Sequence, residues 1–223
     1  MMLYHGSNIE MEKTDLRKRK PFKDFGCGFY TTPISEQALT MARRTVRIYN
    51  EGKPCITEFK CDDALFIDSQ EGSYPAALRR SEFATVWENT GMNPHTIHTL
   101  QNDDTPLLCG GESHSEKNPV IHTLNLKKFD EPSNEWAKFV INNRNRKFSC
   151  LRSPECNTDN KYDVVIGTVA NDDITALIDV YLSGILSDNA LTRELTFRDL
   201  SLQVSFHTEK SIVHLYKTGV FYG

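Results

Sequence analysis

Two short segments near the start of the chain each place a hydrogen-bonding ring beside glycine. Residues 3–7 read Leu-Tyr-His-Gly-Ser, and residues 25–32 read Phe-Gly-Cys-Gly-Phe-Tyr-Thr-Thr. Glycine has no side chain, so a flat ligand can approach the backbone closely at these positions. The rings of His5 and Tyr30 can both pack against such a ligand and hydrogen-bond. Together the two segments predict a binding site for a flat, polar ligand.

The N-terminal part of the chain is expected to hold these segments on strands followed by one helix. A short strand at 3–5 ends at the Gly-Ser pair, and alternating residues at 55–61 predict a half-buried strand. Ser35 is a suitable N-cap for a helix that ends before Gly52 and Pro54. The expected apolar stripe of this helix comprises Ala38, Met41, Ala42, Thr45 and Tyr49.

Regular patterns return in the C-terminal half. Residues 162–167 are almost uniformly apolar, which favours a strand at the centre of a sheet. Strands and helices follow no regular βαβ order, so an α+β class is favoured over a doubly wound sheet. The other elements expected here are a strand at 120–126, a helix capped by Ser133, a helix capped by Asn171 with Leu182 and Ile185 on its buried face, a short helix around 190–195, a strand at 202–207 and a helix at 211–216 that stops at Gly219.

Residues 68–119 interrupt this order. The stretches 101–106 and 109–116 have loop compositions, and one local helix is expected around 81–88. Loops of this length are usually functional or mobile. We therefore expect a single domain over residues 1–223 with an insertion at 68–119.

Composition limits the classes of function. With 223 residues, 39% hydrophobic and 25% charged, the chain is long enough for one sizeable core and typical of a globular domain. A net charge of −4 gives no general attraction to nucleic acid. No apolar run approaches the length of a membrane span, and the N-terminus lacks a secretory signal pattern. A cytoplasmic protein without a membrane partner is expected.

A metal site is not expected. The six cysteines form no Cys-x-x-Cys pair, and their spacing to histidine does not fit a zinc site. His95, His98, His114 and His122 lie in or beside the insertion without ligand spacing. Free, mostly buried thiols in a reducing compartment are the simpler interpretation.

Residues 202–206, Leu-Gln-Val-Ser-Phe, complete a pattern with the first two segments. In this order the three segments resemble the motifs of the ADP-ribosyltransferase superfamily, in the branch whose signature is His, then Tyr, then Glu, Asp or Gln. The chain is similar to a bacterial ADP-ribosyltransferase-like family of that branch. The resemblance implies two small, mostly antiparallel sheets that form an NAD cleft flanked by helices.

The same resemblance implies an activity and a role for each motif residue. The expected reaction is mono-ADP-ribosyl transfer from NAD, a co-substrate, to a macromolecular acceptor, as a bacterial toxin or regulatory modifier, with a protein rather than a nucleic acid as acceptor. His5 would hydrogen-bond the adenosine ribose, and Ser7 would assist there. The Gly6 backbone would bind the nicotinamide carboxamide, and Tyr30 would stack on its ring. Gln203 would be the catalytic residue that hydrogen-bonds the nicotinamide ribose.

Two departures from the family pattern affect these roles. Ala38 and Met41 stand where poly-ADP-ribose polymerases carry a serine and a second tyrosine, so one side of the nicotinamide slot is expected to be built differently. Chain elongation into poly-ADP-ribose is not expected. A neutral Gln203 orients hydroxyls but stabilises a cationic transition state less than a carboxylate would, a difference of about 3 kcal/mol. Glu209 is the other candidate for the missing acid, although the helix dipole alone explains an acid at that position. Asp24 could reach the cleft or could simply cap the turn. If the pocket accepts a further charge, Gln203→Glu should raise the rate.

Other interpretations stay open. A binding module for NAD or ADP-ribose with weak or lost catalysis is the alternative from another class, and simple NAD hydrolysis differs only by lacking an acceptor. At the level of residues, His5 would be a structural histidine, Tyr30 a core aromatic, and Gln203 an exposed strand residue.

Overall fold

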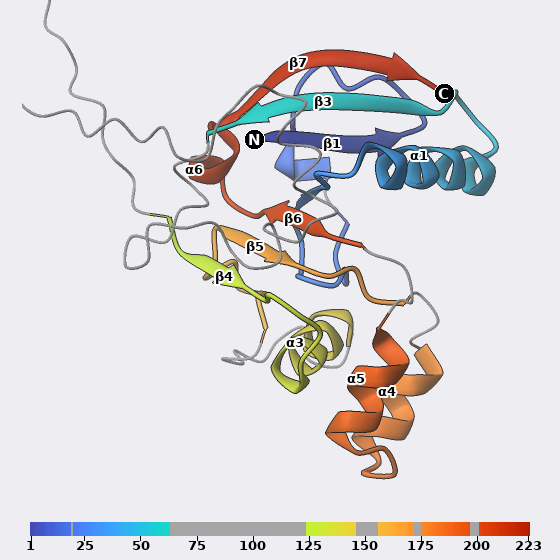
Figure 1. Cartoon of the computed structure of the whole chain (residues 1–223), viewed down its shortest axis with the longest axis vertical. Coiled ribbons are helices and arrows are strands. Elements are labelled where there is room, and N and C mark those ends of the chain that lie inside the picture. Colours follow the sequence, from blue (N-terminus) through green and yellow to red (C-terminus); the bar gives the residue numbers. More distant parts are fainter. Residues whose placement is uncertain (19, 63–123, 146–155, 172–174, 197–200) are drawn as a thin grey trace, which may run out of the picture.

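The computed structural model describes residues 1–18, 20–62, 124–145, 156–171, 175–196 and 201–223. The predicted insertion at 68–119, its expected helix at 81–88 and most of the expected strand at 120–126 lie outside these ranges. The described strands form two small sheets, which confirms the α+β class (Figure 1).

A three-stranded antiparallel sheet has the strand order β1, β3, β7. A four-stranded sheet has the order β2, β6, β5, β4, and its β4–β5 pair is parallel. The bounds of the strands are β1 Met2–Ser7, β2 Phe29–Thr31, β3 Cys55–Cys61, β4 Leu126–Lys128, β5 Val164–Gly167, β6 Gln203–Phe206 and β7 Leu215–Tyr222.

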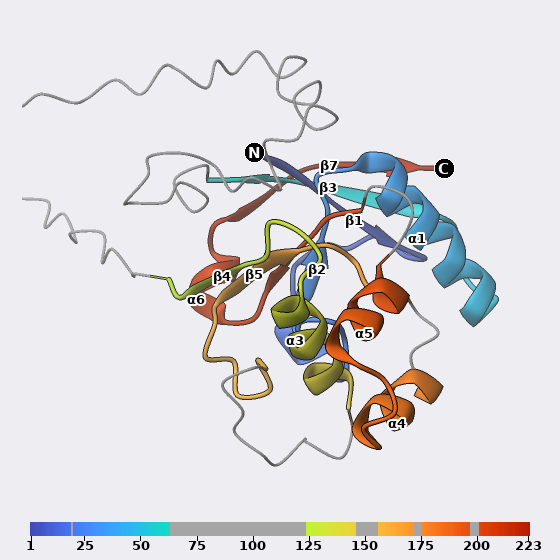
Figure 2. The same ribbon diagram turned by 60° about the horizontal axis from the view of Figure 1, so that its bottom comes forward.

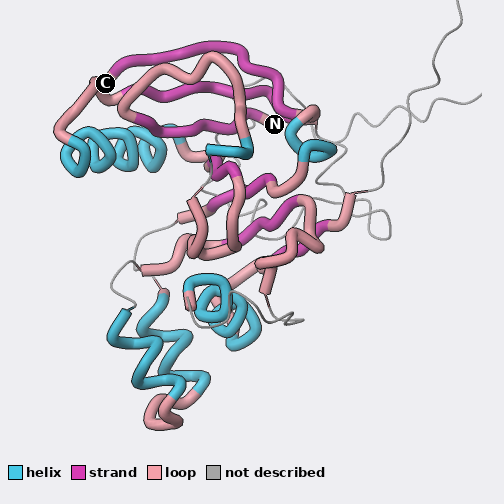
Figure 3. The backbone as a smooth tube through the Cα atoms, turned by 180° about the vertical axis from the view of Figure 1, so that it is seen from behind, coloured by secondary structure: helices cyan, strands magenta, loops and turns pink. Residues whose placement is uncertain are grey.

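The helices lie mainly outside the two sheets. In Figures 1 and 2, α1 runs along the three-stranded sheet, while α3, α4 and α5 gather beyond the four-stranded sheet. Figure 3 shows the same layers from behind. The bounds are Leu16–Lys18 for a 3-10 turn, α1 Ser35–Tyr49, α3 Asn134–Arg144, α4 Thr175–Leu182, α5 Asp188–Leu195 and α6 Glu209–Ile212. None of these helices is long and apolar enough to cross a membrane.

Two hydrophobic clusters cover opposite faces of the four-stranded sheet. The first joins it to the three-stranded sheet, with Leu3 and Phe59 packed against Val204 and Phe206. The second joins the other face to α3 and α5, through residues such as Val165. Because strand side chains alternate, Gln203 and Ser205 must lie on the face opposite to Val204 and Phe206, as predicted from the sequence.

Several elements agree with local sequence signals. The strand at 55–61 is confirmed, and β5 is fully buried inside its sheet as its apolar run predicts. Ser133 caps α3 by accepting a hydrogen bond from the Trp136 N–H. The short helix α5 buries Leu191 and Leu195.

The predicted helix at 211–216 is wrong. Helix α6 ends at Ile212, and Leu215–Tyr222 forms β7, which pairs with β3 at the edge of the three-stranded sheet. Gly219 does not stop a helix, since it pairs with Glu58 at a register shift in this ladder. Glycine is common where a strand bulges, because it has no side chain to place.

For two helices the predicted buried face includes residues that are exposed in the structure. Along α1, Ala38 and Ala42 are buried, whereas Met41 is 43% exposed and Tyr49 is 50% exposed. Helix α1 begins at Ser35, so Ile34 and not Ser35 stands at the N-cap. At the end of α4 Leu182 is 42% exposed, and after it Ile185 is 79% exposed, whereas both were expected on a buried face. The buried face of α1 is formed by small alanine side chains because a strand packs closely against it.

Candidate functional site

The three motif segments lie on neighbouring strands. Strands β1 and β2 belong to different sheets, but Tyr4 and Thr32 exchange main-chain hydrogen bonds of 2.8 and 2.9 Å. In the β2–β6 ladder Tyr30 faces Ser205, and the next pair follows in antiparallel register. Continued by one residue beyond β2, that register brings Thr32 opposite Gln203. His5, Tyr30 and Gln203 therefore come from three strands that meet at one bridge.

His5 is held by the main chain of the second motif. Its Nδ1 lies 2.7 Å from the carbonyl oxygen of Tyr30. A carbonyl only accepts, so Nδ1 carries the proton and the Nε2 of a neutral ring is an acceptor. The ring also lies 4.6 Å from that of Phe29. Burial lowers the pKa of His5, and the hydrogen bond to Tyr30 offsets this only in part, so the neutral ring is favoured.

Gly6 and Ser7 have local structural partners. A Cβ at Gly6 would lie 1.9 Å from the carbonyl oxygen of Ala38, so only glycine lets β1 pass this close to α1. The hydroxyl of Ser7 accepts a hydrogen bond from the Ile9 N–H at 3.3 Å, which closes a turn after β1. Packing against α1 is thus a sufficient reason for glycine at position 6, whatever its backbone binds.

Tyr30 anchors the turn that precedes its strand. Its hydroxyl accepts from the Phe25 N–H at 3.0 Å and donates to the Gly26 carbonyl at 2.7 Å. The half-buried ring packs against the second hydrophobic cluster. Burial first, and the negative charge of Asp24 second, raise the pKa of Tyr30 well above its ordinary value. The hydroxyl therefore stays protonated and keeps both bonds.

Gln203 is buried, so its interpretation as an exposed strand residue is wrong. Its Nε2 donates to Oδ2 of Asp24 at 2.8 Å and approaches the Thr168 carbonyl at 3.4 Å. Both partners are acceptors, which fixes the amide with its nitrogen toward them and Oε1 on the other side. With only 7% of its surface exposed, the residue still presents one atom, Oε1, as a hydrogen-bond acceptor.

One acceptor atom on each of His5 and Gln203 is left for a ligand. Neither His5 Nε2 nor Gln203 Oε1 has a hydrogen-bond partner among the described residues. Among the described residues, enclosed side-chain atoms without a hydrogen-bond partner include Thr57 Oγ1, Asn160 Oδ1 and Ser201 Oγ. His5 and Gln203, on two of the three neighbouring strands, therefore each keep one acceptor that can receive a hydroxyl hydrogen.

Asp24, not Glu209, is the acid beside Gln203. Asp24 is 3% exposed, and its Oδ1 is paired with the guanidinium of Arg144 at the end of α3. Its Oδ2 accepts from the Ala170 N–H at 3.0 Å as well as from Gln203. Nothing in the sequence pattern pointed to Arg144, because an ordinary helix C-terminus also explains a basic residue there.

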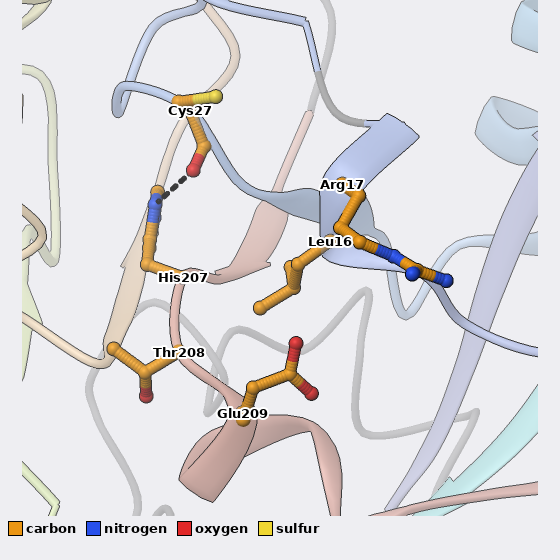
Figure 4. A pocket seen from close by; sticks show the side chains of 6 residues that line it. All are labelled: Leu16, Arg17, Cys27, His207, Thr208 and Glu209. Atoms are coloured by element: carbon orange, nitrogen blue, oxygen red, sulfur yellow. Dashed lines mark hydrogen bonds between the residues drawn. The ribbon is translucent and has the colours of Figure 1, made fainter.

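Glu209 lies at the other end of β6. There a hollow of about 450 Å³ is lined by Leu16, Arg17, Cys27, His207, Thr208 and Glu209 (Figure 4). In the close view the Glu209 side chain extends from α6 toward the turn that carries Leu16 and Arg17. His207 Nε2 lies 2.8 Å from Ser205 Oγ, which keeps the ring on the face that also carries Gln203. The lining of this hollow includes none of the five predicted site residues.

Over the described part of the chain, no three His, Cys, Asp or Glu side chains gather in a way that could hold a metal ion.

Comparison with known proteins places the chain in a family. No curated protein and no solved structure matches it. A family described as "Protein of unknown function (DUF3990)" matches residues 1–75 and 112–216, which include all three motif segments. The unmatched stretch, 76–111, falls inside the span predicted as an insertion. Because the matched residues make up well over half of the sequence, the chain belongs to the family described as "Protein of unknown function (DUF3990)".

Proposed function

We propose that this chain is a mono-ADP-ribosyltransferase of the ADP-ribosyltransferase fold, which moves ADP-ribose from NAD to a macromolecular acceptor. The observation that carries the proposal is the meeting of three distant motif segments at the Tyr4–Thr32 bridge. The sequence motifs by themselves identify His5, Tyr30 and Gln203. Neighbouring strands are the arrangement in which they can act on one ligand.

The open acceptors fit the hydroxyls of the two NAD riboses. Neutral His5 offers Nε2 to the adenosine ribose, and its Nδ1 bond to Tyr30 keeps the ring in the required tautomer. Gln203 offers Oε1 to the nicotinamide ribose. Ribose hydroxyls are donors, so acceptors on both residues match them.

In the proposed reaction the bond from nicotinamide to the ribose carbon breaks, and nicotinamide leaves as a neutral ring with the bonding electrons. The acceptor then forms a bond to that carbon and loses a proton. Positive charge develops on the ribose, where Gln203 Oε1 would lie. The amide nitrogen of Gln203 donates to a carboxylate, and this bond polarises the amide so that Oε1 carries more negative charge.

A binding module with little or no turnover is the second candidate, and one observation favours it. The Asp24 carboxylate is compensated by Arg144, so it adds little net negative charge near the ribose. Such a site would hold NAD or ADP-ribose well and stabilise the cationic transition state poorly. Simple NAD hydrolysis is the case in which water serves as the acceptor.

The test is nicotinamide release from NAD by the full chain and by two variants. Gln203→Ala should abolish release, because it removes the only side chain proposed to act on the nicotinamide ribose. Glu209→Ala should keep most of it, because Glu209 lines a hollow at the far end of β6. Radiolabelled NAD with a cell extract would then show whether a protein accepts the label.

Each contrary result has a clear meaning. NAD binding without turnover in the wild type would establish the binding module instead. Activity that survives Gln203→Ala and is lost in Glu209→Ala would move the catalytic site to the hollow. No binding of NAD at all would overturn the proposed function.

A further inference from the structure

We infer that Asp24 is the positioning residue for Gln203, fixing the side-chain amide so that Oε1 faces the nicotinamide ribose. The inference rests on the proposed function for what Oε1 does. The orientation of the amide itself stands on contacts within the chain, and the experiments below separate the two.

The contacts leave one orientation for the amide. Asp24 Oδ2 and the Thr168 carbonyl both face the Gln203 nitrogen, at 2.8 and 3.4 Å. A flipped amide would set Oε1 against two acceptors in a buried place, with no donor to compensate. It would also present the amide hydrogens, which are donors, where a ribose hydroxyl needs an acceptor.

Two further groups hold the Asp24 carboxylate in place. Arg144 pairs with Oδ1, and the Ala170 N–H donates to Oδ2 at 3.0 Å. The chain just after Asp24 is fixed by Tyr30, whose hydroxyl bonds the main chain of Phe25 and Gly26. The tyrosine of the second motif thus supports the acid that orients the glutamine of the third.

This arrangement also accounts for glutamine where a carboxylate is expected. The carboxylate of the site is already at position 24, one hydrogen bond behind the amide. Gln203→Glu would bring two carboxylates to about the same close distance, where they cannot both be ionised. The gain in rate expected from the sequence for this variant is therefore replaced by a loss.

The decisive experiment is a double-variant cycle with nicotinamide release as the readout. Asp24→Asn alone and Gln203→Glu alone should each lower kcat by about a hundredfold, with KM for NAD little changed. In the double variant the new amide at position 24 can donate to the new carboxylate at position 203, although the Ala170 N–H then loses its acceptor. The other carboxylate oxygen is left toward the ribose. The kcat of the double variant should exceed that of either single variant by about tenfold.

A merely structural role for Asp24 predicts a different pattern. Removing a structural ion pair would leave the double variant no better than Asp24→Asn, and that result would overturn the inference. Asp163→Asn is the matched control. Asp163 is a buried acid paired with Lys210, and its carbonyl accepts from the His207 N–H, at the far end of β6. This control should lower the melting temperature and leave kcat within about twofold of the wild type.

A second measurement decides the matter even if Asp24→Asn and Gln203→Glu fold poorly or the wild type is inactive. In amide hydrogen-exchange spectra of the wild-type chain, the side-chain NH₂ of Gln203 should exchange slowly, because its hydrogens point to Asp24 and Thr168. The signal is assigned by its absence in Gln203→Ala. Rapid exchange would overturn the inferred orientation. Slow exchange in a chain without nicotinamide release would support the orientation and remove only the proposed function.

Discussion

Nδ1 of His5 donates a hydrogen bond to the carbonyl oxygen of Tyr30, 2.7 Å away and 25 residues later in the chain. The bond joins the first two motif segments through the main chain of the second, so it does not depend on the tyrosine side chain. It also leaves Nε2 of the neutral imidazole as an acceptor. The first four predictions follow from this bond and its immediate neighbours.

NAD should bind more weakly to His5→Ala than to the wild type. Loss of one ribose hydrogen bond is worth about 1.4 kcal/mol, or about tenfold in Kd, measured by titration calorimetry. His214→Ala, a change at a half-buried histidine after α6, should leave Kd unchanged. Equal affinity in all three proteins would remove His5 from the proposed site.

Stability should decrease with acid because of His5. Burial holds its pKa in the folded chain below the ordinary value of 6.5. Above that value both states are neutral at His5, whereas below it the unfolded chain takes up a proton that the folded chain resists. The stability difference between wild type and His5→Gln should therefore shrink as the pH falls from about 7.5 to about 5, in urea titrations. A difference independent of pH would contradict the shift.

Gly6→Ala should destabilise the chain through α1. The new methyl would meet the Ala38 carbonyl at 1.9 Å, so strand and helix must move apart, at a cost of about 1–3 kcal/mol in urea unfolding. In Gly219→Ala the nearest atom lies at 3.5 Å, an ordinary contact, and the change should cost much less. Equal costs would mean that close packing at Gly6 is not what requires glycine.

Tyr30→Phe should separate the two roles of this residue. The ring remains for stacking, but the buried Phe25 N–H loses its acceptor, which costs about 1–3 kcal/mol of unfolding free energy. Tyr222→Phe, which removes an exposed hydroxyl bonded to Glu10, is the control and should change little. If Tyr30 stacks on nicotinamide, the affinity for NAD survives Tyr30→Phe and falls in Tyr30→Ala.

Replacement of residues 68–119 by a short Gly/Ser linker should preserve a cooperative thermal melt. Loop closure entropy changes only slowly with loop length, and the strands on either side pack into cores formed by other segments. Circular dichroism during heating provides the measurement. A chain that no longer melts cooperatively would show that this span contributes to the core.

Where one segment carries its own signal, the sequence by itself determined the structure. The alternation at 55–61, the cap at Ser133 and the apolar run at 162–167 all gave the observed elements. The same alternation placed Val204 and Phe206 in the core and Gln203 on the other face. Local periodicity and capping decide these features, because their partners are a few residues away or are any apolar surface.

Only the tertiary structure decided what the candidate residues touch. Asp24 and Gln203 are 179 residues apart, and their contact depends on the register of β2 with β6 and on the end of α3. Gly219 is compatible with a helix stop until β3 provides the ladder in which it marks a register shift. A hydrogen bond between distant segments requires both to be positioned by the fold, and a single sequence contains no local signal for that distance.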